Sequence, residues 1–205
     1  GNGDGATNLV ANAVGDAFVR AGQGVGSSTG ALTVKLPKLT SISTAHGDLF
    51  LTALQDLQGT TFEAEQGNLV VNANGVSLTY DRLAAHGNLS VHGGNLDVGH
   101  LQATTGTLSL DGLGQVSVDS ADVGGVAGIT AADVTLGRFD STGSFTAVTS
   151  GDYSAITQST GGAFSLQSMN ATFGSLTVAG TTGMTLTQDL LGLGLLKAGA
   201  DWNLS

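Results

Sequence analysis

The four histidines are the residues of this sequence best suited to binding a metal or transferring a proton near neutral pH. His46 and His86 hold the same position, directly before a glycine, in two units of a repeat of about 19 residues. If the units stack as strands, equivalent side chains two units apart are separated by about 10 Å, too far to share a metal. His92 and His100 fall in one unit but near different corners of it. We therefore expect four surface histidines and no metal site.

Acidic residues gather in the middle of the chain and could attract calcium. Two adjacent repeat units contain Asp111, Asp119, Asp122 and Asp133. Calcium needs six or more oxygen ligands that converge on one point, and the glycine- and aspartate-rich nonapeptide of calcium-binding β-rolls is absent. Asn2 and Asp4, in the glycine-rich start of the chain, are candidates of the same weak kind. The sequence predicts a solvated acidic face and no bound metal.

One polar position recurs directly after the repeated glycine. It is occupied by Asp48, Asn68, Asn88 and Thr107. In a stacked architecture these side chains form a single column. The simpler interpretation is an exposed polar ladder, and the alternative is a stripe that binds a sugar or a protein.

Two arginines have a carboxylate close by in the sequence, as the active site of a polysaccharide-cleaving enzyme would require. Arg82 follows Asp81, and Arg138 is near Asp140. The repeat register places no obvious acidic or basic neighbour beside either pair. We therefore predict no catalytic residues, no cofactor-binding residues and no metal ligands, and expect that the protein is not an enzyme.

The elements that carry these residues follow from glycines spaced 18 to 20 residues apart. The glycines are Gly47, Gly67, Gly87, Gly106, Gly125, Gly143 and Gly162. The residues two and four places after each one are apolar in every case, as in Leu49 and Leu51 or Leu89 and Val91. Such alternation directs one face of a strand towards a core.

Each unit contains two further alternating pairs. The second set comprises Val76/Leu78, Leu96/Val98, Val116/Val118, Val134/Leu136, Tyr153/Ala155 and Ala171/Phe173. The third set comprises Phe62/Ala64, Leu83/Ala85, Leu101/Ala103, Ala121/Val123 and Leu176/Val178. Gly99, Gly114 and Gly137 lie near the corners, where a positive φ is often needed. The chain is thus expected to be all-β, a right-handed parallel β-helix of about ten coils with three short strands each.

Composition supports this class and excludes others. Of 205 residues, 40% are hydrophobic and 11% charged, with 33 glycines and one proline, Pro37. The net charge of −10 comes without a basic patch, which argues against nucleic acid and anionic membranes as partners. The apolar run 190–196 is far too short for the roughly 18 residues of a membrane span. We expect no membrane insertion.

The chain divides into three parts. Residues 1–29 are an irregular glycine-rich start or partial coils, although Phe18 and Val19 could belong to a strand. Residues 30–185 carry the β-helix repeats, with Gly30, Leu32 and Val34 as a further coil start. Residues 186–205 are expected to form a modified coil or to continue the β-helix. Because the chain starts at Gly1 without a methionine, we interpret it as a piece of a longer protein.

The segments His46-Gly47-Asp48-Leu49-Phe50-Leu51, Gln66-Gly67-Asn68-Leu69-Val70-Val71 and His86-Gly87-Asn88-Leu89-Ser90-Val91 resemble filamentous haemagglutinin repeats. These repeats belong to the large exoproteins of bacterial two-partner secretion, and the resemblance covers roughly residues 30–185. It implies a secreted or cell-surface location and export through an outer-membrane two-partner-secretion transporter. The absence of cysteine agrees with threading through such a pore, which a disulfide would block.

The family implies a function in adhesion and virulence, with this chain as the extracellular shaft of an adhesin. Its partners would be a receptor or glycan on a host or neighbouring cell. The alternative parent is a contact-dependent inhibition protein that delivers a toxin. The amino-terminal secretion domain of the family, with its Asn-Pro-Asn motifs, and a toxin-like C-terminal domain are missing from this sequence.

An enzyme is the alternative from a different class, since polysaccharide lyases and pectinases also use parallel β-helices. Fold alone cannot decide this. The discriminating feature is a groove flanked by converging carboxylates, which the near-constant coil length does not favour because it leaves few long loops.

Overall fold

The computed structural model describes residues 9–10 and 16–204, and this part of the chain contains strands and turns but no helix. The strands in chain order are β1 (Leu9–Val10), β2 (Phe18–Ala21), β3 (Leu32–Lys35), β4 (Ser41–Thr44), β5 (Leu49–Ala53), β6 (Leu57–Ala64), β7 (Leu69–Asn72), β8 (Leu78–Ala85), β9 (Leu89–Gly93), β10 (Leu96–Ala103), β11 (Leu108–Gly112), β12 (Gln115–Val123), β13 (Ala127–Ala131), β14 (Asp133–Ser141), β15 (Phe145–Thr149), β16 (Asp152–Thr160), β17 (Phe164–Val178), β18 (Thr182–Ala198) and β19 (Trp202–Leu204).

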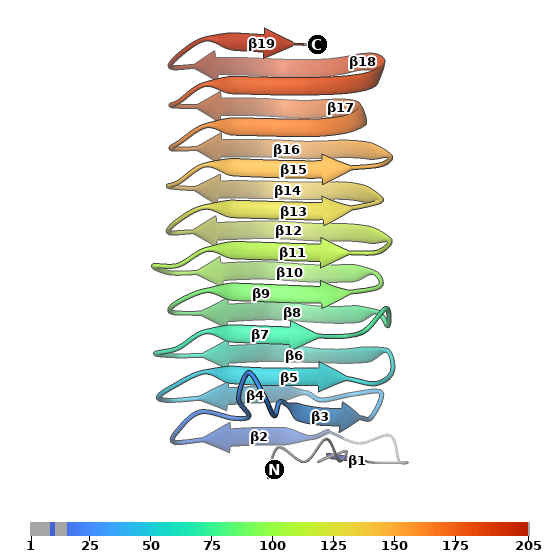
Figure 1. The fold of residues 1–205 in the computed structure, drawn as a ribbon, viewed down its shortest axis with the longest axis vertical. Coiled ribbons are helices and arrows are strands. Elements are labelled where there is room, and N and C mark those ends of the chain that lie inside the picture. The colour runs from blue at the N-terminus through green and yellow to red at the C-terminus, as the bar shows by residue number, and fades with distance from the viewer. Residues whose placement is uncertain (1–8, 11–15, 205) are drawn as a thin grey trace.

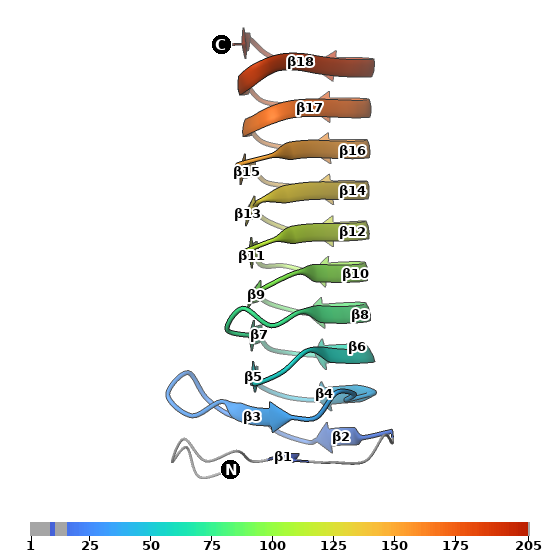
Figure 2. The same ribbon diagram turned by 90° about the vertical axis from the view of Figure 1, so that its right-hand side faces the viewer.

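The strands wind into a parallel β-solenoid of about nine turns. Up to β16, each strand pairs in parallel with the strand two places along the chain, so that odd-numbered strands stack on odd-numbered ones and even on even. In Figure 1 the chain rises while it runs to the right in front and to the left behind, which makes the coil right-handed, as the twist of parallel strands favours. Figure 2 shows the same stack from the side. The predicted right-handed β-helix with coils of about 19 residues is confirmed.

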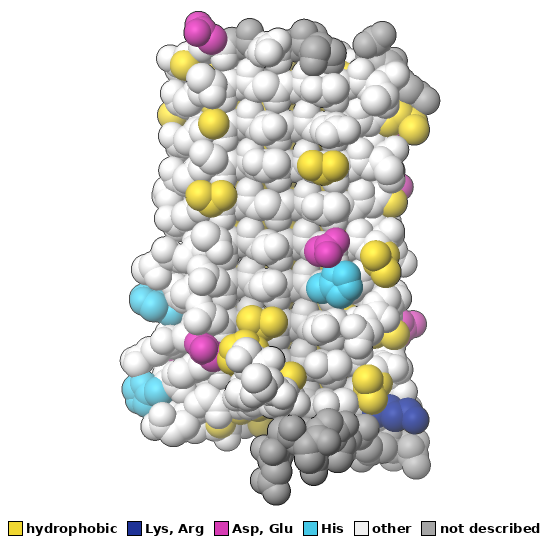
Figure 3. Space-filling view, viewed as in Figure 1, with side chains coloured by type: hydrophobic (Ala, Val, Ile, Leu, Met, Phe, Trp, Pro, Cys, Tyr) yellow, Lys and Arg dark blue, Asp and Glu magenta, His cyan; other side chains and the backbone are white. Residues whose placement is uncertain are grey.

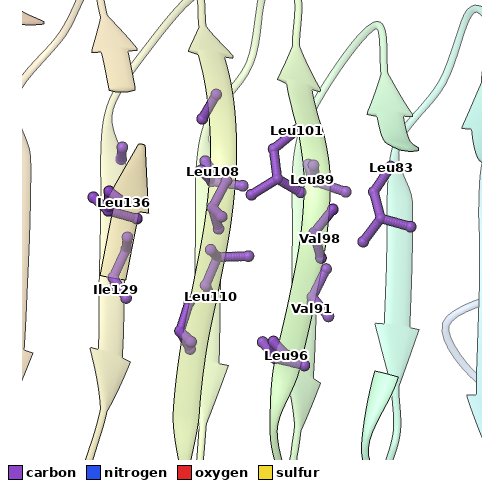
Figure 4. Close-up of a cluster of buried hydrophobic side chains, with 14 of the residues drawn as sticks. Leu83, Leu89, Val91, Leu96, Val98, Leu101, Leu108, Leu110, Ile129 and Leu136 are labelled. Atoms are coloured by element: carbon purple, nitrogen blue, oxygen red, sulfur yellow. The ribbon is translucent and has the colours of Figure 1, made fainter. Parts of the chain in front are cut away.

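The glycine-anchored pairs form the first inward-facing set, as predicted. All fourteen side chains are buried, with relative exposures of 2% or less. Leu89 pairs in register with Leu69 on one side and Leu108 on the other. Figure 4 shows such leucines and valines pointing into the interior from successive coils. Because each strand buries every second residue, one continuous stack of apolar side chains extends along the solenoid.

The second and third predicted pairs belong to one longer strand that bends between them. In β10, Leu96 and Val98 point inward before the bend, and Leu101 and Ala103 do so after it. The pairing between β10 and β12 passes over Gly99, which marks the bend. From β7 to β16, each coil therefore has three inward-facing pairs on two strands, whereas β17 carries all three pairs in one strand.

One predicted second pair is displaced. In the coil that starts at Gly67, Leu78 and Tyr80 occupy the column of Leu96 and Val98, in place of Val76 and Leu78. This coil contains a longer turn at Asn74 and Gly75, both with positive φ, which moves the strand start by two residues.

The corner glycines are required for a reason other than the predicted one. Among the described residues, a positive φ occurs at Gly26, Gly47, Gly75 and Asn74, so Gly99, Gly114 and Gly137 do not need it. Instead, a Cβ on Gly137 would lie 2.2 Å from the carbonyl oxygen of Asp119 in the coil below. Close stacking of the backbone selects glycine at these corners.

The expected coil start at Gly30, Leu32 and Val34 is out of register by two residues. Leu32 pairs with Leu51, while Leu49 pairs with Val25. Residues 26–31 leave the coil as a loop before β3 (Figure 2). Phe18 and Val19 do lie in a strand, β2.

Near the other end, strand pairing continues past Gly180. Strand β18 pairs with β17 along most of its length, and the register shifts between Ser168 and Asn170. Strand β19 pairs with the first residues of β18.

Candidate functional site

The column that begins at Asp48 is a hydrogen-bonded ladder that links successive coils. The Asn68 backbone N–H donates to Asp48 Oδ1 over 2.7 Å, and the Asn88 N–H donates to Asn68 Oδ1 over 2.7 Å. The Thr107 N–H and hydroxyl both donate to Asn88 Oδ1, at 2.9 and 3.1 Å. These oxygens satisfy backbone donors in turns where the strand ladder is interrupted. The column therefore has a structural role.

A second ladder of the same kind lies directly before the even-numbered strands, and it was not predicted from the sequence. The Ser77 N–H donates to Asp56 Oδ1, the Gln115 N–H to Asn95 Oδ1 and the Asp152 N–H to Asp133 Oδ1, all within 2.9 Å. The signal that could have revealed it is the recurrence of Asp or Asn directly before the second inward pair.

The histidines are dispersed along the surface. His46 Nδ1 lies 2.6 Å from Gln66 Oε1, and His92 Nδ1 lies 2.9 Å from Asp111 Oδ2. His86 lies two coils away from His46, and no side-chain contact among the described residues joins the two. His46 and His92 thus each contact a polar residue one coil further along.

His100 contacts a serine hydroxyl one coil further along. Its Nδ1 lies 2.9 Å from the Ser120 hydroxyl, which itself donates to the carbonyl oxygen of Gly99 over 3.3 Å. A hydroxyl that donates to Gly99 can accept a hydrogen bond from the imidazole, so the two contacts are compatible and link His100 to Ser120 of the next coil.

The predicted acidic face does not converge on one point. Asp111 contacts His92, Asp133 accepts the Asp152 N–H, and Asp122 contacts Arg138. Within residues 9–10 and 16–204, no three His, Asp or Glu side chains are grouped so that they could hold a metal ion. Asn2 and Asp4 lie outside the described residues.

The two arginines have stacked acidic neighbours, contrary to the sequence analysis. The Arg82 guanidinium donates to Glu63 Oε1 at 3.3 Å and to Gln102 Oε1 at 2.9 Å; these residues lie one coil below and one above. Asp81, its expected partner, lies at the bend, in the position equivalent to Gly99, and makes no ion pair in the described structure. The repeat register did not reveal this ion pair, because Thr61 stacks directly on Arg82 and Glu63 lies two residues further along the strand.

Arg138 bridges two carboxylates. It forms an ion pair with Asp140, as expected, and another with Asp122 of the preceding coil at 3.4 Å. Asp122 and Asp140 are in register, so their charges stack directly and would repel each other without the guanidinium. The carboxylates raise the pKa of Arg138, with Asp140 contributing most through its hydrogen bond.

A shallow groove lies beside this bridge, where β10, β12 and β14 end at the left edge of Figure 1. Its volume is about 400 Å³. The lining comprises residues 102–104, 122–124 and 140–142, together with Ser159. Successive coils thus build one concave strip along the solenoid axis.

The core contains a hydrogen-bonded polar pair, Tyr153 and Gln158. Tyr153 belongs to the second set of inward pairs predicted from the sequence, whereas Gln158 was not predicted to point inward. The Tyr153 hydroxyl donates to Gln158 Oε1, and both side chains are fully buried. Burial raises the pKa of the Tyr153 phenol, although the bond to Gln158 opposes this. Gln158 Nε2 has no hydrogen-bond partner among the residues that the structure describes. No signal in the repeat predicts a glutamine in an inward position between Phe139 and Leu176.

The outer surface is otherwise poor in charge. Figure 3 shows a face on which charged side chains are few and scattered. The described residues contain no helix that could cross a membrane. No protein-family model matches the chain, no curated protein matches it, and no solved structure matches it. Fold and surface together define a parallel β-solenoid whose polar ladders are structural.

Proposed function

We propose that this chain is a rigid extracellular shaft segment of a large bacterial exoprotein of the filamentous haemagglutinin type. The shaft holds distal parts of the protein away from the cell surface during adhesion. The observation that carries the proposal is the parallel stacking of coils of similar length along one axis.

The stacked coils give the solenoid the length that a shaft requires. About nine turns at about 4.8 Å each make a rod of roughly 43 Å. Each coil contacts its neighbours alone, so added coils lengthen the rod without a new design. The resemblance of the glycine-anchored segments supports the exoprotein class and export through an outer-membrane transporter. The lack of cysteine is compatible with that route.

The proposal is tested by changing coil number in the exported parent protein. Residues 47–66 and 67–86 are two coils of equal length outside the groove. We delete either one, and in a third variant replace 47–66 with a copy of 67–86. Attachment of bacteria to host cells is then measured at equal surface expression.

A spacer predicts that both deletions weaken attachment equally and that the replacement restores it. If one deletion abolishes attachment and the equal-length replacement does not restore it, that coil holds a specific receptor site and the spacer proposal fails. If killing of neighbouring bacteria, and not attachment, follows coil number, the adhesin role fails in favour of the toxin-delivery parent.

A further inference from the structure

We infer that the groove beside Asp122 and Asp140 is a binding site for a neutral oligosaccharide chain that runs along the solenoid axis. The inference does not depend on the shaft proposal, because it concerns the side chains of the groove alone.

The floor of the groove is an in-register row of polar side chains. Gln102 pairs with Asp122, Asp122 with Asp140, and Asp140 with Ser159. Successive members are one coil apart, or about 4.8 Å, so the row extends over about 14 Å. The row suits an extended polymer better than a single small molecule.

These four side chains retain unused hydrogen-bonding capacity. Arg138 contacts Asp122 through Oδ1 and Asp140 through Oδ2, which leaves the other oxygen of each carboxylate without a partner in the described structure. Gln102 accepts from Arg82 through Oε1, so its two amide N–H donors remain. The Ser159 hydroxyl has no partner among the described residues. The row thus offers a donor, two acceptors and a hydroxyl that can do either.

Charge selects the class of ligand. The two carboxylates disfavour a polyanion. A polycation would have to compete with Arg138, which already contacts both carboxylates. Hydroxyl groups of a neutral sugar can donate to the free carboxylate oxygens without displacing the arginine. Because Arg138 fixes both carboxylates before binding, little side-chain freedom is lost when the ligand binds.

The shape of the groove agrees with this class. Its volume of about 400 Å³ falls within the range of roughly 300–1,000 Å³ typical of ligand sites. Ala103 and Val123 also line the groove, but their side chains point into the core and are at most 4% exposed, so the groove contacts its ligand through polar groups. Its shallowness predicts weak binding.

The test uses the 205-residue chain, isotope-labelled for NMR, and titrates it with defined hexasaccharides. The neutral probes are cellohexaose, isomaltohexaose and chitohexaose in its N-acetylated form; hexagalacturonate and hexalysine are the charged comparisons. We expect at least one neutral probe to shift the amide signals of Gln102, Asp122, Asp140 and Ser159.

Substitutions locate the contact. Ser159→Ala removes one hydroxyl and is expected to raise Kd about three- to tenfold, the effect of losing one hydrogen bond. Thr177→Ala is the matched control, because Thr177 is the next residue in the row but lies outside the groove lining. It should leave Kd unchanged, and both variants should keep the melting temperature of the parent. Asp140→Asn should weaken binding in the same direction as Ser159→Ala.

The inference is overturned if none of the neutral probes shifts these signals, if shifts map to another surface, or if Ser159→Ala and Thr177→Ala weaken binding equally. Binding of hexalysine or hexagalacturonate alone would overturn it as well. None of these results bears on coil number in the attachment assay, so failure of the groove and failure of the shaft are distinguishable.

Discussion

At the scale of single residues, the two tyrosines place ionisable phenol groups in the core. The chain contains only Tyr80 and Tyr153, and both are almost fully buried. The Tyr80 hydroxyl donates to the carbonyl oxygen of Leu39 over 3.3 Å. Burial raises the pKa of both phenols above the usual value, because a phenolate in the core would lose its hydration.

This arrangement predicts how stability depends on alkaline pH. A raised pKa in the folded state means that the phenols stabilise the fold fully below the unfolded pKa of about 10, and that this contribution is lost as the pH rises further. We expect no phenolate absorbance until the protein unfolds, after which both tyrosines ionise together. The denatured chain in urea serves as the control and should titrate near pH 10. A phenolate signal that rises while circular dichroism still reports intact strands would contradict the buried positions.

The Tyr153–Gln158 pair makes a second residue-scale prediction. Tyr153→Phe or Gln158→Met alone leaves its partner without a hydrogen bond in the core and should cost about 1–3 kcal/mol. The double variant removes both polar groups, including the unpaired Gln158 Nε2, and should unfold at or above the denaturant midpoint of the parent. Chemical denaturation of the four proteins measures the coupling. Additive losses would show that the two side chains do not interact.

At the scale of the coil, glycine at the turn permits backbones to stack closely. A Cβ on Gly106 would lie 2.4 Å from the backbone of Gly87, whereas a Cβ on Gly128, within β13, would meet nothing within 4 Å. Gly106→Ala should therefore destabilise the protein by about 1–3 kcal/mol, because the coils must separate locally. Gly128→Ala should be neutral or stabilising by up to about 1 kcal/mol, since it restricts the unfolded chain. Equal effects on the melting temperature would show that close stacking does not select these glycines.

The inward direction of each strand can be tested on β9. Leu89→Asp places an unpaired charge between Leu69 and Leu108 and should cost about 4 kcal/mol or more. Ser90→Asp, on the outward side of the same strand, should change stability by no more than about 0.5 kcal/mol. Thermal unfolding of both variants decides the register: if they are equally stable, the assigned inward face is wrong.

The coil pattern was predictable where turns have constant length. From Gly87 onward, the first and second inward pairs recur at similar offsets, and those two columns could be placed from alternation alone. The third column could not be placed throughout, because it holds the buried polar residues Ser141, Gln158 and Thr160. The loop 26–31 and the turn at Asn74 and Gly75 shift the following strand, and local sequence does not reveal how many residues a turn absorbs. Asp122 and Asp140 are separated by 18 residues, the length of one coil, so the repeat spacing was sufficient to predict that they stack. The bridge by Arg138 was not, because it joins residues offset along neighbouring strands.

At the scale of the whole molecule, the structure is a one-dimensional stack. Strand pairing is parallel throughout the described chain and connects nearest coils, so stability is approximately a sum over coils and their interfaces. The groove and the polar ladders are products of this register, since each arises where equivalent residues of successive coils meet. Because each coil contacts only its nearest coils, the length of the solenoid can change by adding or removing coils, and the proposed role as a shaft depends on this.

The most direct test of this account is to lengthen the solenoid and measure its shape. Three additional copies of residues 87–105, inserted in tandem after Thr105, preserve the register of every inward pair. Small-angle X-ray scattering should show a particle about 14 Å longer than the parent with the same cross-sectional radius. An increase in cross-section, or no increase in the longest dimension, would contradict the claim that each coil is an interchangeable unit of length.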